Sequence, residues 1–291
     1  MLYAAAGVLG TVMSMELSTP SALLVGDTHA NARWMENVVL PNAAAQGVQT
    51  VIVVGDFGYW QEASRFLQIV NSAKERFGLE VWFLDGNHEQ HSLLAHDAAA
   101  CRVEGDEPRS PVRLGESLVY LPRGAVVEVA GLSVLAMGGA ASIDRLQRHV
   151  GVDWFYEELL SDADIAAGQR AALGLGGVDV LLCHDAPAGW TVPGLIPYDH
   201  LPSSWARVLP ECWDHRRRLA DVYAVAEPKM VVHGHYHSAY ELEVDEDWGA
   251  VRVVGLNCDG SAGWGRVLSA ADGRPLLGDR ISPMPYKKPS R

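Results

Sequence analysis

Five short blocks of polar residues recur along the chain, and each follows an apolar run. They are rich in aspartate, asparagine and histidine, whose oxygen and imidazole donors suit divalent transition ions better than calcium or magnesium alone. Donors of this kind predict two metal ions held side by side, a centre suited to the hydrolysis of phosphate esters. In chain order the blocks are Gly26-Asp27-Thr28-His29, Gly55-Asp56, Gly86-Asn87-His88-Glu89, Cys183-His184 and Gly234-His235-Tyr236-His237.

The apolar runs before these blocks are expected to form buried parallel strands. In an open α/β sheet, ligands bind at the edge where the parallel strands end, so the five blocks are expected to meet at that edge. The runs are Leu23 to Val25, Val51 to Val54, Val81 to Leu84, Val178 to Cys183, and Met230 to Val232.

The spacing within the blocks fits metal binding. Asp27 and His29 are two residues apart, so in extended backbone both side chains lie on the same side of the chain and can hold one ion. His235 and His237 repeat this spacing, which lets each face a different ion. Asp56 ends the neighbouring strand, where a carboxylate can bridge two ions about 3.5 to 4 Å apart. Glycines before these residues permit sharp turns and leave room for the metals.

Other patterns predict the supporting elements. Residues 62–77 place apolar side chains on one helical face. Ser161, followed by Asp164, resembles a capping box that opens a helix through Ala172. The remaining expectations are helices at 29–46, interrupted near Pro41, and at about 211–226, and strands at 117–127, 132–137, 239–244, 251–256 and 265–268, with a turn at Ala130-Gly131.

Size and composition favour one large domain. The chain has 291 residues, and a hydrophobic fraction of 48% is ample for a buried core. We expect a single domain over residues 21–282, a disordered or non-native leader over 1–20 and a loose tail over 283–291. Residues 185–228 form a long excursion on the substrate side and are a candidate lid.

Charge and cysteine usage disfavour several classes of protein. The formal net charge of -13 argues against a long nucleic acid as partner, whereas a small phosphorylated substrate drawn to local metal charge is compatible. The four cysteines form no Cys-x-x-Cys pair, which favours reduced thiols and a cytoplasmic protein. The apolar stretch from Leu2 to Met13 has no preceding Lys or Arg, which disfavours secretion, and no membrane-spanning run is present.

The ordered blocks resemble the calcineurin-like metallophosphoesterase superfamily over roughly residues 21–270, including stand-alone phage and actinobacterial members. The resemblance implies a four-layer αββα sandwich with two mixed β-sheets and a dinuclear metal site at the C-terminal ends of the strands. It also implies that His88 lies beside the scissile ester. The implied ligands are Asp27, His29, Asp56 and His237 for one ion, and Asp56, Asn87, His184 and His235 for the other.

The implied mechanism follows from charge. A water held between two divalent ions loses its proton near neutral pH, because even one zinc ion lowers that pKa from about 15.7 to about 7. The metal-bridging hydroxide attacks phosphorus while the ions neutralise the phosphoryl oxygens. His88 assists departure of the ester oxygen as a general acid or hydrogen-bond donor. Glu89 and Asp85 are both candidates for orienting His88.

Several further residues allow two interpretations of their role. His184 has the weakest local signature, and its place in the ordered set makes it a ligand candidate. Arg145 and Arg148 follow a glycine-rich segment found in some superfamily members, and they either contact substrate phosphate or form structural salt bridges. Trp190, Tyr198 and Trp205 either line a base-binding wall or pack under a loop. Three further groups are expected in structural positions. His233 is expected to pack at a strand end, and Arg216 to Arg218 to form a solvated helix face. The histidines expected on the surface or in loops are His91, His96, His149, His200 and His215.

The blocks also bear on the substrate. Protein Ser/Thr phosphatases follow their second block with an Asp-Arg-Gly sequence, whereas here Gly55-Asp56 continues as Phe57-Gly58-Tyr59-Trp60. The paired final histidines resemble the phosphodiesterase and nuclease branches. Phosphodiesters, including cyclic nucleotides, are therefore favoured over phosphomonoesters, and a Ser/Thr protein phosphatase-like phosphomonoesterase is the alternative. A non-catalytic scaffold with this fold predicts gaps among the ligand blocks, and none are present. The ligand set accepts manganese, iron, zinc, cobalt or nickel.

Overall fold

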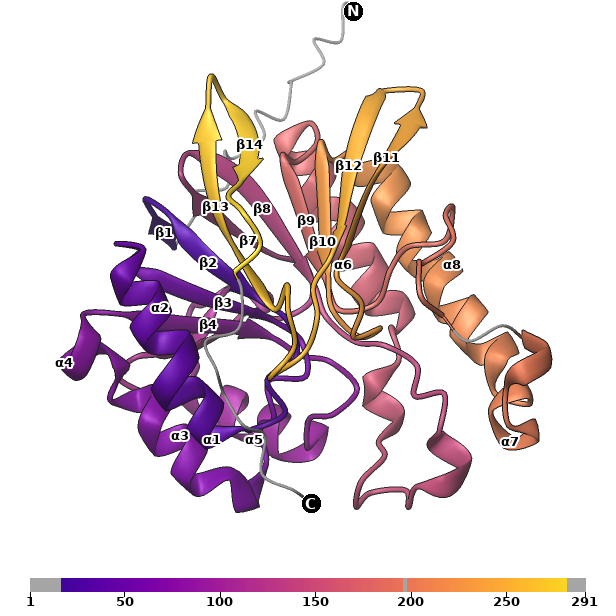
Figure 1. Cartoon of the computed structure of the whole chain (residues 1–291), viewed down its shortest axis with the longest axis horizontal. Helices are drawn as coiled ribbons and strands as arrows, with labels where there is room; N and C mark the ends of the chain where they lie inside the picture. Colours follow the sequence, from indigo (N-terminus) through magenta and orange to yellow (C-terminus); the bar gives the residue numbers. More distant parts are fainter. Residues whose placement is uncertain (1–16, 196–197, 282–291) are drawn as a thin grey trace, which may run out of the picture.

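The computed structural model describes residues 17–195 and 198–281. Two mixed seven-stranded sheets pack against each other, with helices on both outer faces (Figure 1). The four-layer αββα arrangement predicted from the sequence is confirmed. Residues 1–16 of the expected leader and the expected tail at 283–291 lie outside the described residues. Among the described residues, no helix has the length and apolar character needed to cross a bilayer.

The first sheet contains the strands that precede the first three polar blocks. Its central strands β2, β3 and β4 are parallel, so their carboxyl ends share one edge. The sheet order is β14 (Arg274–Leu277), β13 (Gly265–Ala271), β2 (Ala22–Val25), β3 (Thr50–Val54), β4 (Glu80–Leu84), β6 (Leu118–Tyr120) and β5 (Val112–Arg113). Its outer face carries α1 (Ala32–Trp34), the π-helical η1 (Met35–Val39), α2 (Leu40–Ala45), η2 (Gln61–Ala63), α3 (Ser64–Asn71), α4 (Ala73–Phe77) and α5 (His91–Cys101).

The second sheet contains the strands before the last two blocks. Strands β9 and β10 are parallel and adjacent. The sheet order is β1 (Ser18–Thr19), β7 (Ala125–Val129), β8 (Leu132–Met137), β9 (Val180–Cys183), β10 (Met230–His233), β12 (Gly249–Gly255) and β11 (Tyr240–Glu246). Its outer side carries α6 (Asp162–Leu175) and α8 (Leu209–Ala226), and the short helices are η3 (Arg145–Gln147), η4 (Tyr156–Glu158), η5 (Tyr198–His200) and α7 (Ser203–Ala206).

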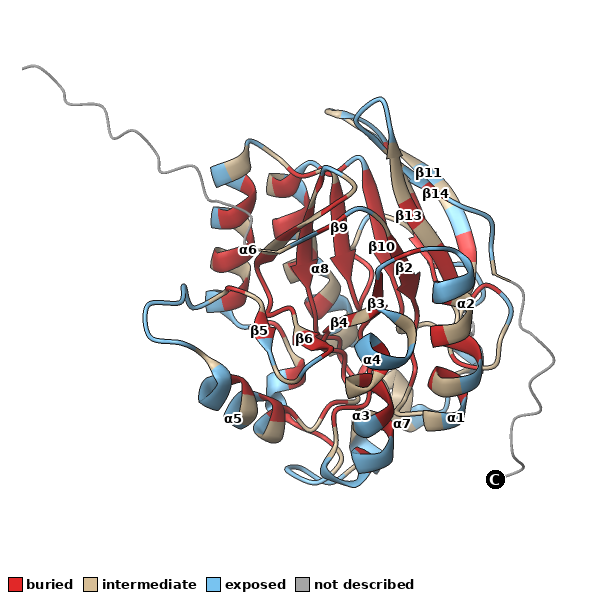
Figure 2. Cartoon of the chain, turned by 90° about the vertical axis from the view of Figure 1, so that its left-hand side faces the viewer, coloured by how far each residue is buried: buried red, intermediate tan, exposed pale blue. Residues whose placement is uncertain are grey.

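Three apolar cores hold the four layers together, and alternation along each strand divides side chains between them. In β3, Ile52 and Val54 face the core between the sheets, whereas Val51 and Val53 face the helices of the first layer. A third core lies between the second sheet and α6 and α8. The central strands are therefore buried on both faces, whereas the helices bury one side and expose the other (Figure 2).

Local signals set several element boundaries as expected. Ser161 forms the predicted capping box with Asp164, and α6 continues past Ala172 until Gly176 adopts a left-handed conformation. Ala130 and Gly131, both with positive φ, form the predicted turn between β7 and β8.

Other boundaries differ from the sequence prediction. The single strand expected over 117–127 is wrong: β6 belongs to one sheet and β7 to the other, because Pro122 and Gly124 interrupt the extended run. The helix expected over 62–77 is broken at Ser72, which ends α3 and precedes α4. The extended backbone also begins earlier than the predicted start at residue 21, since β1 pairs with β7.

Candidate metal centre

The five polar blocks meet at one end of the two sheets. Asp27, Asp56 and Asn87 follow β2, β3 and β4 of the first sheet. His184 and His235 follow β9 and β10 of the second sheet. Because the two sheets pack face to face, their carboxyl ends bring these blocks together from distant parts of the chain.

Four of the predicted ligands form a compact group of donors. Asp27, His29, Asp56 and His237 each offer one ligand atom, and these atoms all lie within 4.8 Å of one another. His237 Nε2 lies 3.0 Å from Asp27 Oδ2, and His29 Nε2 lies 3.5 Å from Asp56 Oδ2. Both aspartates are buried, so solvent competes little for their carboxylates.

The other predicted ligands gather on the opposite side of Asp56. His184 Nε2 lies 3.2 Å from Asp56 Oδ1 and 3.3 Å from Asn87 Oδ1. The rings of His184 and His235 make an edge contact, with centroids 5.2 Å apart. Asp56 therefore directs one carboxylate oxygen toward each group of ligands.

The backbone at the centre is strained. His29, Asp56, His235 and His237 have φ values of 46°, 45°, 67° and 49°, in the left-handed region that side chains with a Cβ rarely adopt. Each such residue costs on the order of 1–3 kcal/mol, and strain of this kind clusters at functional sites. The strained backbone therefore coincides with the place where the carboxylate and imidazole groups converge.

Glycines provide the space in which the ligands meet. A Cβ atom at Gly55 would lie 2.1 Å from His184 Nδ1, and one at Gly86 would lie 2.2 Å from Asp56 Oδ1. At Gly234 a Cβ atom would lie 2.3 Å from Asp27 Oδ1. Any larger residue at these positions would displace a ligand side chain.

Charge coupling within the centre is strong. Burial alone would lower the pKa of His184, but the Asp56 carboxylate raises it to about 10. Burial also opposes protonation of His29, yet its contacts with Asp259 and Asp56 raise its pKa to about 11. Divalent ions compete with these protons for the ring nitrogens, so their affinity rises with pH.

The donor set fits divalent transition ions. It combines carboxylate, amide and imidazole groups, and backbone N–H groups orient the two carboxylates. His88 N donates to Asp56 Oδ1 over 2.8 Å, and His235 N donates to Asp27 Oδ1 over 3.1 Å. The remaining carboxylate lone pairs face imidazoles rather than Lys or Arg side chains.

His88 lies at the rim of the centre, with its ring centroid 5.5 Å from that of His29. Its Nε2 lies 2.8 Å from Arg148 Nη2. A guanidinium group only donates hydrogen bonds, so Nε2 accepts and the ring carries its proton on Nδ1. Burial, with the charge of Arg148 adding to it, lowers the pKa of His88 below its ordinary value.

The two carboxylates considered as orienting groups for His88 have other partners. Glu89 accepts from the backbone N–H groups of Gly58 and Gly86, and Asp85 pairs with Arg123 over 2.7 Å. Arg148, itself paired with Asp144 over 2.9 Å, is the side chain in contact with the His88 imidazole.

Arg145, the other arginine predicted to bind substrate, has a structural setting. It forms an ion pair with Glu211 over 2.6 Å, and its guanidinium stacks on the Trp154 ring. The two arginines of one short segment therefore differ: Arg148 contacts the centre and Arg145 joins the segment to α8.

Some expectations about histidines and arginines are wrong. His91 and His215 are buried rather than on the surface, and the His215 Nδ1 lies 2.8 Å from Asp185. Arg216 is not part of a solvated face, because it donates to backbone carbonyls of residues 186, 187 and 190. His233 is packed at its strand end as expected, in contact with the Tyr240 hydroxyl.

Two carboxylates next to the centre were missed by sequence reasoning. Asp259 Oδ1 lies 3.5 Å from His29 Nδ1, and it follows the end of β12 just as other block residues follow their strands. Asp185 follows His184 directly and accepts from Tyr236, which stands between the two final histidines. Both aspartates follow apolar runs in the sequence, but neither belongs to a repeated motif.

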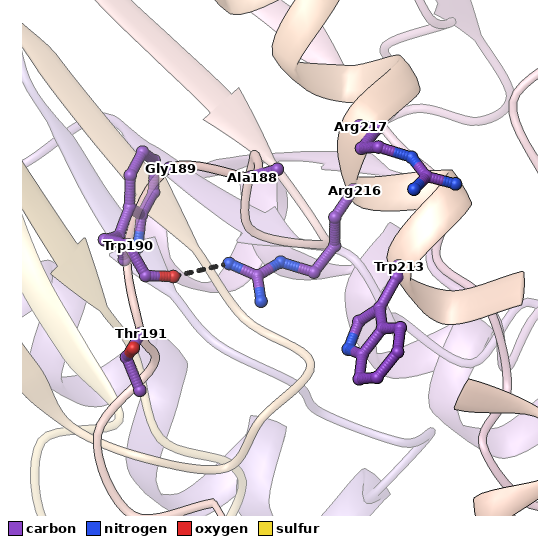
Figure 3. A pocket seen from close by; sticks show the side chains of 7 residues that line it. All are labelled: Ala188, Gly189, Trp190, Thr191, Trp213, Arg216 and Arg217. Carbon is purple, nitrogen blue, oxygen red and sulfur yellow. Dashed lines mark hydrogen bonds between the residues drawn. The ribbon is translucent and has the colours of Figure 1, made fainter. Parts of the chain in front are cut away.

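A separate hollow of about 370 Å³ lies beside α8, away from the predicted ligands. Trp190 and Arg216 line it, and Trp213 stands at its other side (Figure 3). Arg216 donates to the Trp190 carbonyl across this hollow, so the guanidinium joins the excursion to α8. Trp190 also donates to Tyr240, which favours the packing reading of this tryptophan.

Comparisons with known proteins concern the fold and the family of this chain. No curated protein sequence matches the chain. Its fold is similar to that of TT1561 of Thermus thermophilus, with 13% identity, a TM-score of 0.50, and coverage of 90% of this chain and 99% of that one. It is also similar to zinc-bound Vps29 of Entamoeba histolytica, with 12% identity, a TM-score of 0.35, and coverage of 90% and 98%. The model of the calcineurin-like phosphoesterase family matches residues 21–239, and the chain belongs to that family.

Proposed function

We propose that this protein is a dinuclear metal-dependent phosphoesterase that hydrolyses phosphate esters, with phosphodiesters preferred over phosphomonoesters. The observation that carries the proposal is the position of Asp56, whose Oδ2 faces His29 and whose Oδ1 faces His184. A buried carboxylate with one oxygen toward each of two donor groups is the element that a two-metal hydrolase requires.

The ligand assignment follows from this division. One ion would be held by Asp27, His29, Asp56 and His237, and the other by Asp56, Asn87, His184 and His235. When bound, the two ions supply positive charge for the phosphoryl group and lower the pKa of a water. Manganese, iron, zinc, cobalt and nickel all suit these donors.

His88 and Arg148 form the candidate contact with the ester. The guanidinium occupies His88 Nε2, so the imidazole delivers a proton from that nitrogen only after Arg148 releases it. A phosphate group pairs well with a guanidinium and is therefore suited to draw Arg148 away. Substrate binding then frees His88 Nε2, which takes up a proton from solvent and acts on the ester oxygen as acid or donor.

The segment after the second block supports the preference for diesters. Protein Ser/Thr phosphatases carry Asp-Arg-Gly after this block, whereas Phe57-Gly58-Tyr59-Trp60 contains no arginine. The Phe57 ring is buried and stacks on Phe83 with centroids 4.3 Å apart, so this segment offers no cation to a phosphomonoester dianion. The substrate we propose is a small phosphate ester, including nucleotides, because the net charge of -13 disfavours long nucleic acids. All four cysteines are unpaired, in keeping with a cytoplasmic location.

Substrate comparison tests the proposal. The protein loaded with manganese is assayed with bis-p-nitrophenyl phosphate, with 2′,3′-cyclic nucleotides and with a phosphoserine peptide. We expect kcat/KM to be higher for the two kinds of diester. A strong preference for the peptide contradicts the diester assignment and favours the protein phosphatase-like alternative. Absence of hydrolysis of all three substrates contradicts the phosphoesterase assignment itself.

A further inference from the structure

The orientation of one side-chain amide decides what the second ligand group offers to a cation. The two ends of an Asn amide have nearly the same shape, but only the oxygen can bind a metal ion. Asn87 directs Oδ1 toward His184 Nε2, 3.3 Å away, and directs Nδ2 toward Ser142 Oγ, 3.0 Å away. A flip of this amide would present N–H groups to the ion.

The contact with Ser142 does not fix the amide by itself, because a hydroxyl both donates and accepts. Glu158 removes this ambiguity. Its carboxylate accepts from Ser142 N over 2.7 Å and from Ser142 Oγ over 2.8 Å. The single hydroxyl hydrogen is thus directed to the carboxylate, and Oγ has only lone pairs to offer to Asn87.

Burial makes this chain of hydrogen bonds decisive. Asn87, Ser142 and Glu158 are 4%, 1% and 0% exposed, so solvent cannot easily replace a lost partner. In the flipped state, Asn87 Oδ1 would face the Ser142 oxygen and two acceptors would oppose each other. One flip therefore costs a hydrogen bond as well as a metal ligand.

The position of the Glu158 carboxylate is fixed by contacts of the segment that carries it. Arg123 donates to the backbone carbonyls of Glu157 and Glu158, which fixes the short helix that carries Glu158. Ser142 follows β8, so the pair joins two segments of the second layer to a ligand that follows β4 of the first sheet.

We infer that Ser142 and Glu158 are positioning residues that lock the Asn87 amide with its oxygen toward the second metal ion. The inference rests on the proposed two-metal function and adds to it a device that selects the ligand atom. It assigns no contact with substrate to either residue.

The substitution Glu158→Gln tests the inference because it preserves shape and reverses the hydrogen bonds. The oxygen of the introduced amide still accepts from Ser142 N, but its nitrogen now donates to Ser142 Oγ. The hydroxyl hydrogen is then free to donate to Asn87 Oδ1, which turns the Asn87 amide nitrogen toward the ion. We expect affinity for the second Mn²⁺ to fall about tenfold or more, as is usual when a group that orients a ligand is lost.

The measurement is calorimetric titration of metal-free protein with Mn²⁺. Burial raises the pKa of Glu158 to about 7, so the titration is performed at about pH 8, where the carboxylate is ionised. The first binding step should stay unchanged, because none of its four ligands contacts Ser142 in the described structure. The exposed neighbour Glu157 provides the matched control, and Glu157→Gln should leave both steps unchanged.

A double-mutant cycle separates orientation from general support. In Asn87→Asp, both ends of the side chain are oxygens, so a flip no longer changes the ligand atom. We expect Glu158→Gln to cause no loss of second-ion affinity in this background, because the freed Ser142 hydroxyl can donate to the introduced carboxylate. A purely structural role for Glu158 predicts the same loss in both backgrounds.

The outcomes are distinguishable. A wild-type protein that binds fewer than two ions contradicts the proposed function, and the inference with it. A wild-type protein that binds two ions, together with a Glu158→Gln variant of equal second-ion affinity, overturns the inference alone. If Glu158→Gln does not fold, Ser142→Ala removes the only acceptor described for Asn87 Nδ2, and unchanged second-ion affinity there overturns the inference equally.

Discussion

Two buried charged clusters near the same end of the sheets differ in how their charges are balanced. In the Arg123 cluster (Asp85, Arg123 and Asp164), the chain supplies both signs of charge. Arg123 pairs with Asp85 over 2.7 Å and with Asp164 over 3.2 Å, and its other donors reach backbone carbonyls of residues 157–159. Every N–H of the guanidinium has an acceptor.

The metal centre is built in the opposite way. Its carboxylates face imidazoles, four of its residues adopt positive φ, and glycines make the space in which the ligand atoms converge. None of the three Arg123-cluster residues has a positive φ. The comparison teaches that a cluster paired with an arginine is suited to stabilise the fold, whereas a strained cluster of carboxylates and imidazoles is suited to take a cation from solution.

Among the tests of the difference between the two clusters, removal of the Asp56 carboxylate should have the largest effect. Asp56→Asn leaves a side chain of the same shape but withdraws a negative charge from both donor groups. We expect bis-p-nitrophenyl phosphate hydrolysis to fall by at least about 10³-fold, as for loss of a major electrostatic group. Bound manganese, measured by elemental analysis, should fall in parallel. The exposed control Asp199→Asn should change neither quantity.

Removing the counter-charge of the Arg123 cluster should instead damage stability. Arg123→Met leaves the buried Asp85 carboxylate without a cation and Asp164 with only the partly exposed Arg109, which costs about 3–5 kcal/mol of unfolding free energy. Urea denaturation measures this loss. The matched control is Arg109→Met, because Arg109 also pairs with Asp164 but is partly exposed, and its loss should cost about 1 kcal/mol or less. Equal losses in the two variants would contradict the contrast.

The sequence predicted the convergence of the candidate metal ligands better than it predicted the Arg123 cluster, for a physical reason. Asp27, Asp56 and His235 each follow an apolar strand and a glycine, so their position at a shared sheet edge could be inferred from local pattern. Arg123 stands in a Leu-Pro-Arg-Gly segment that links two sheets, and its partners come from 38 and 41 residues away. No local periodicity encodes such pairing.

The same reasoning explains the fold boundaries. Strand identity was predictable because double-sided burial produces continuous apolar runs, as at Val51–Val54. The assignment of β6 and β7 to different sheets was not predictable from such runs, because it depends on one proline and one glycine. Similarly, the opposite settings of Arg145 and Arg148 depend on contacts with Glu211 and His88, which only the folded chain brings near.

Acidification should reduce the stability that the Arg123 cluster contributes, because it protonates Asp164. Burial alone would raise the pKa of Asp164, but the charge of Arg123 and hydrogen bonds from Ser161 lower it from 3.8 to about 2. A lowered carboxyl pKa adds stability that is present above about pH 4 and disappears as the pH falls toward 2, here about 2 kcal/mol.

Urea denaturation of wild type and Asp164→Asn across this pH range checks the expectation. The difference in unfolding free energy between wild type and Asp164→Asn should be largest near neutral pH and should vanish near about pH 2. Asp162→Asn, at an exposed neighbouring carboxylate, should differ from wild type by a small amount throughout. A constant difference for Asp164→Asn would show that its charge does not carry the effect.

The two arginines of the segment after β8 give the smallest and most selective test. Arg148→Gln removes the cation beside His88, and we expect kcat/KM for bis-p-nitrophenyl phosphate to fall about tenfold, the loss of roughly one charged hydrogen bond. Arg145→Gln removes a partly exposed ion pair with Glu211 and should change kcat/KM by less than about twofold. Because the substitutions are identical and three residues apart, a general disturbance of the segment would lower both activities alike. A loss confined to Arg148→Gln therefore assigns the effect to the guanidinium that contacts His88, and equal losses would remove that assignment.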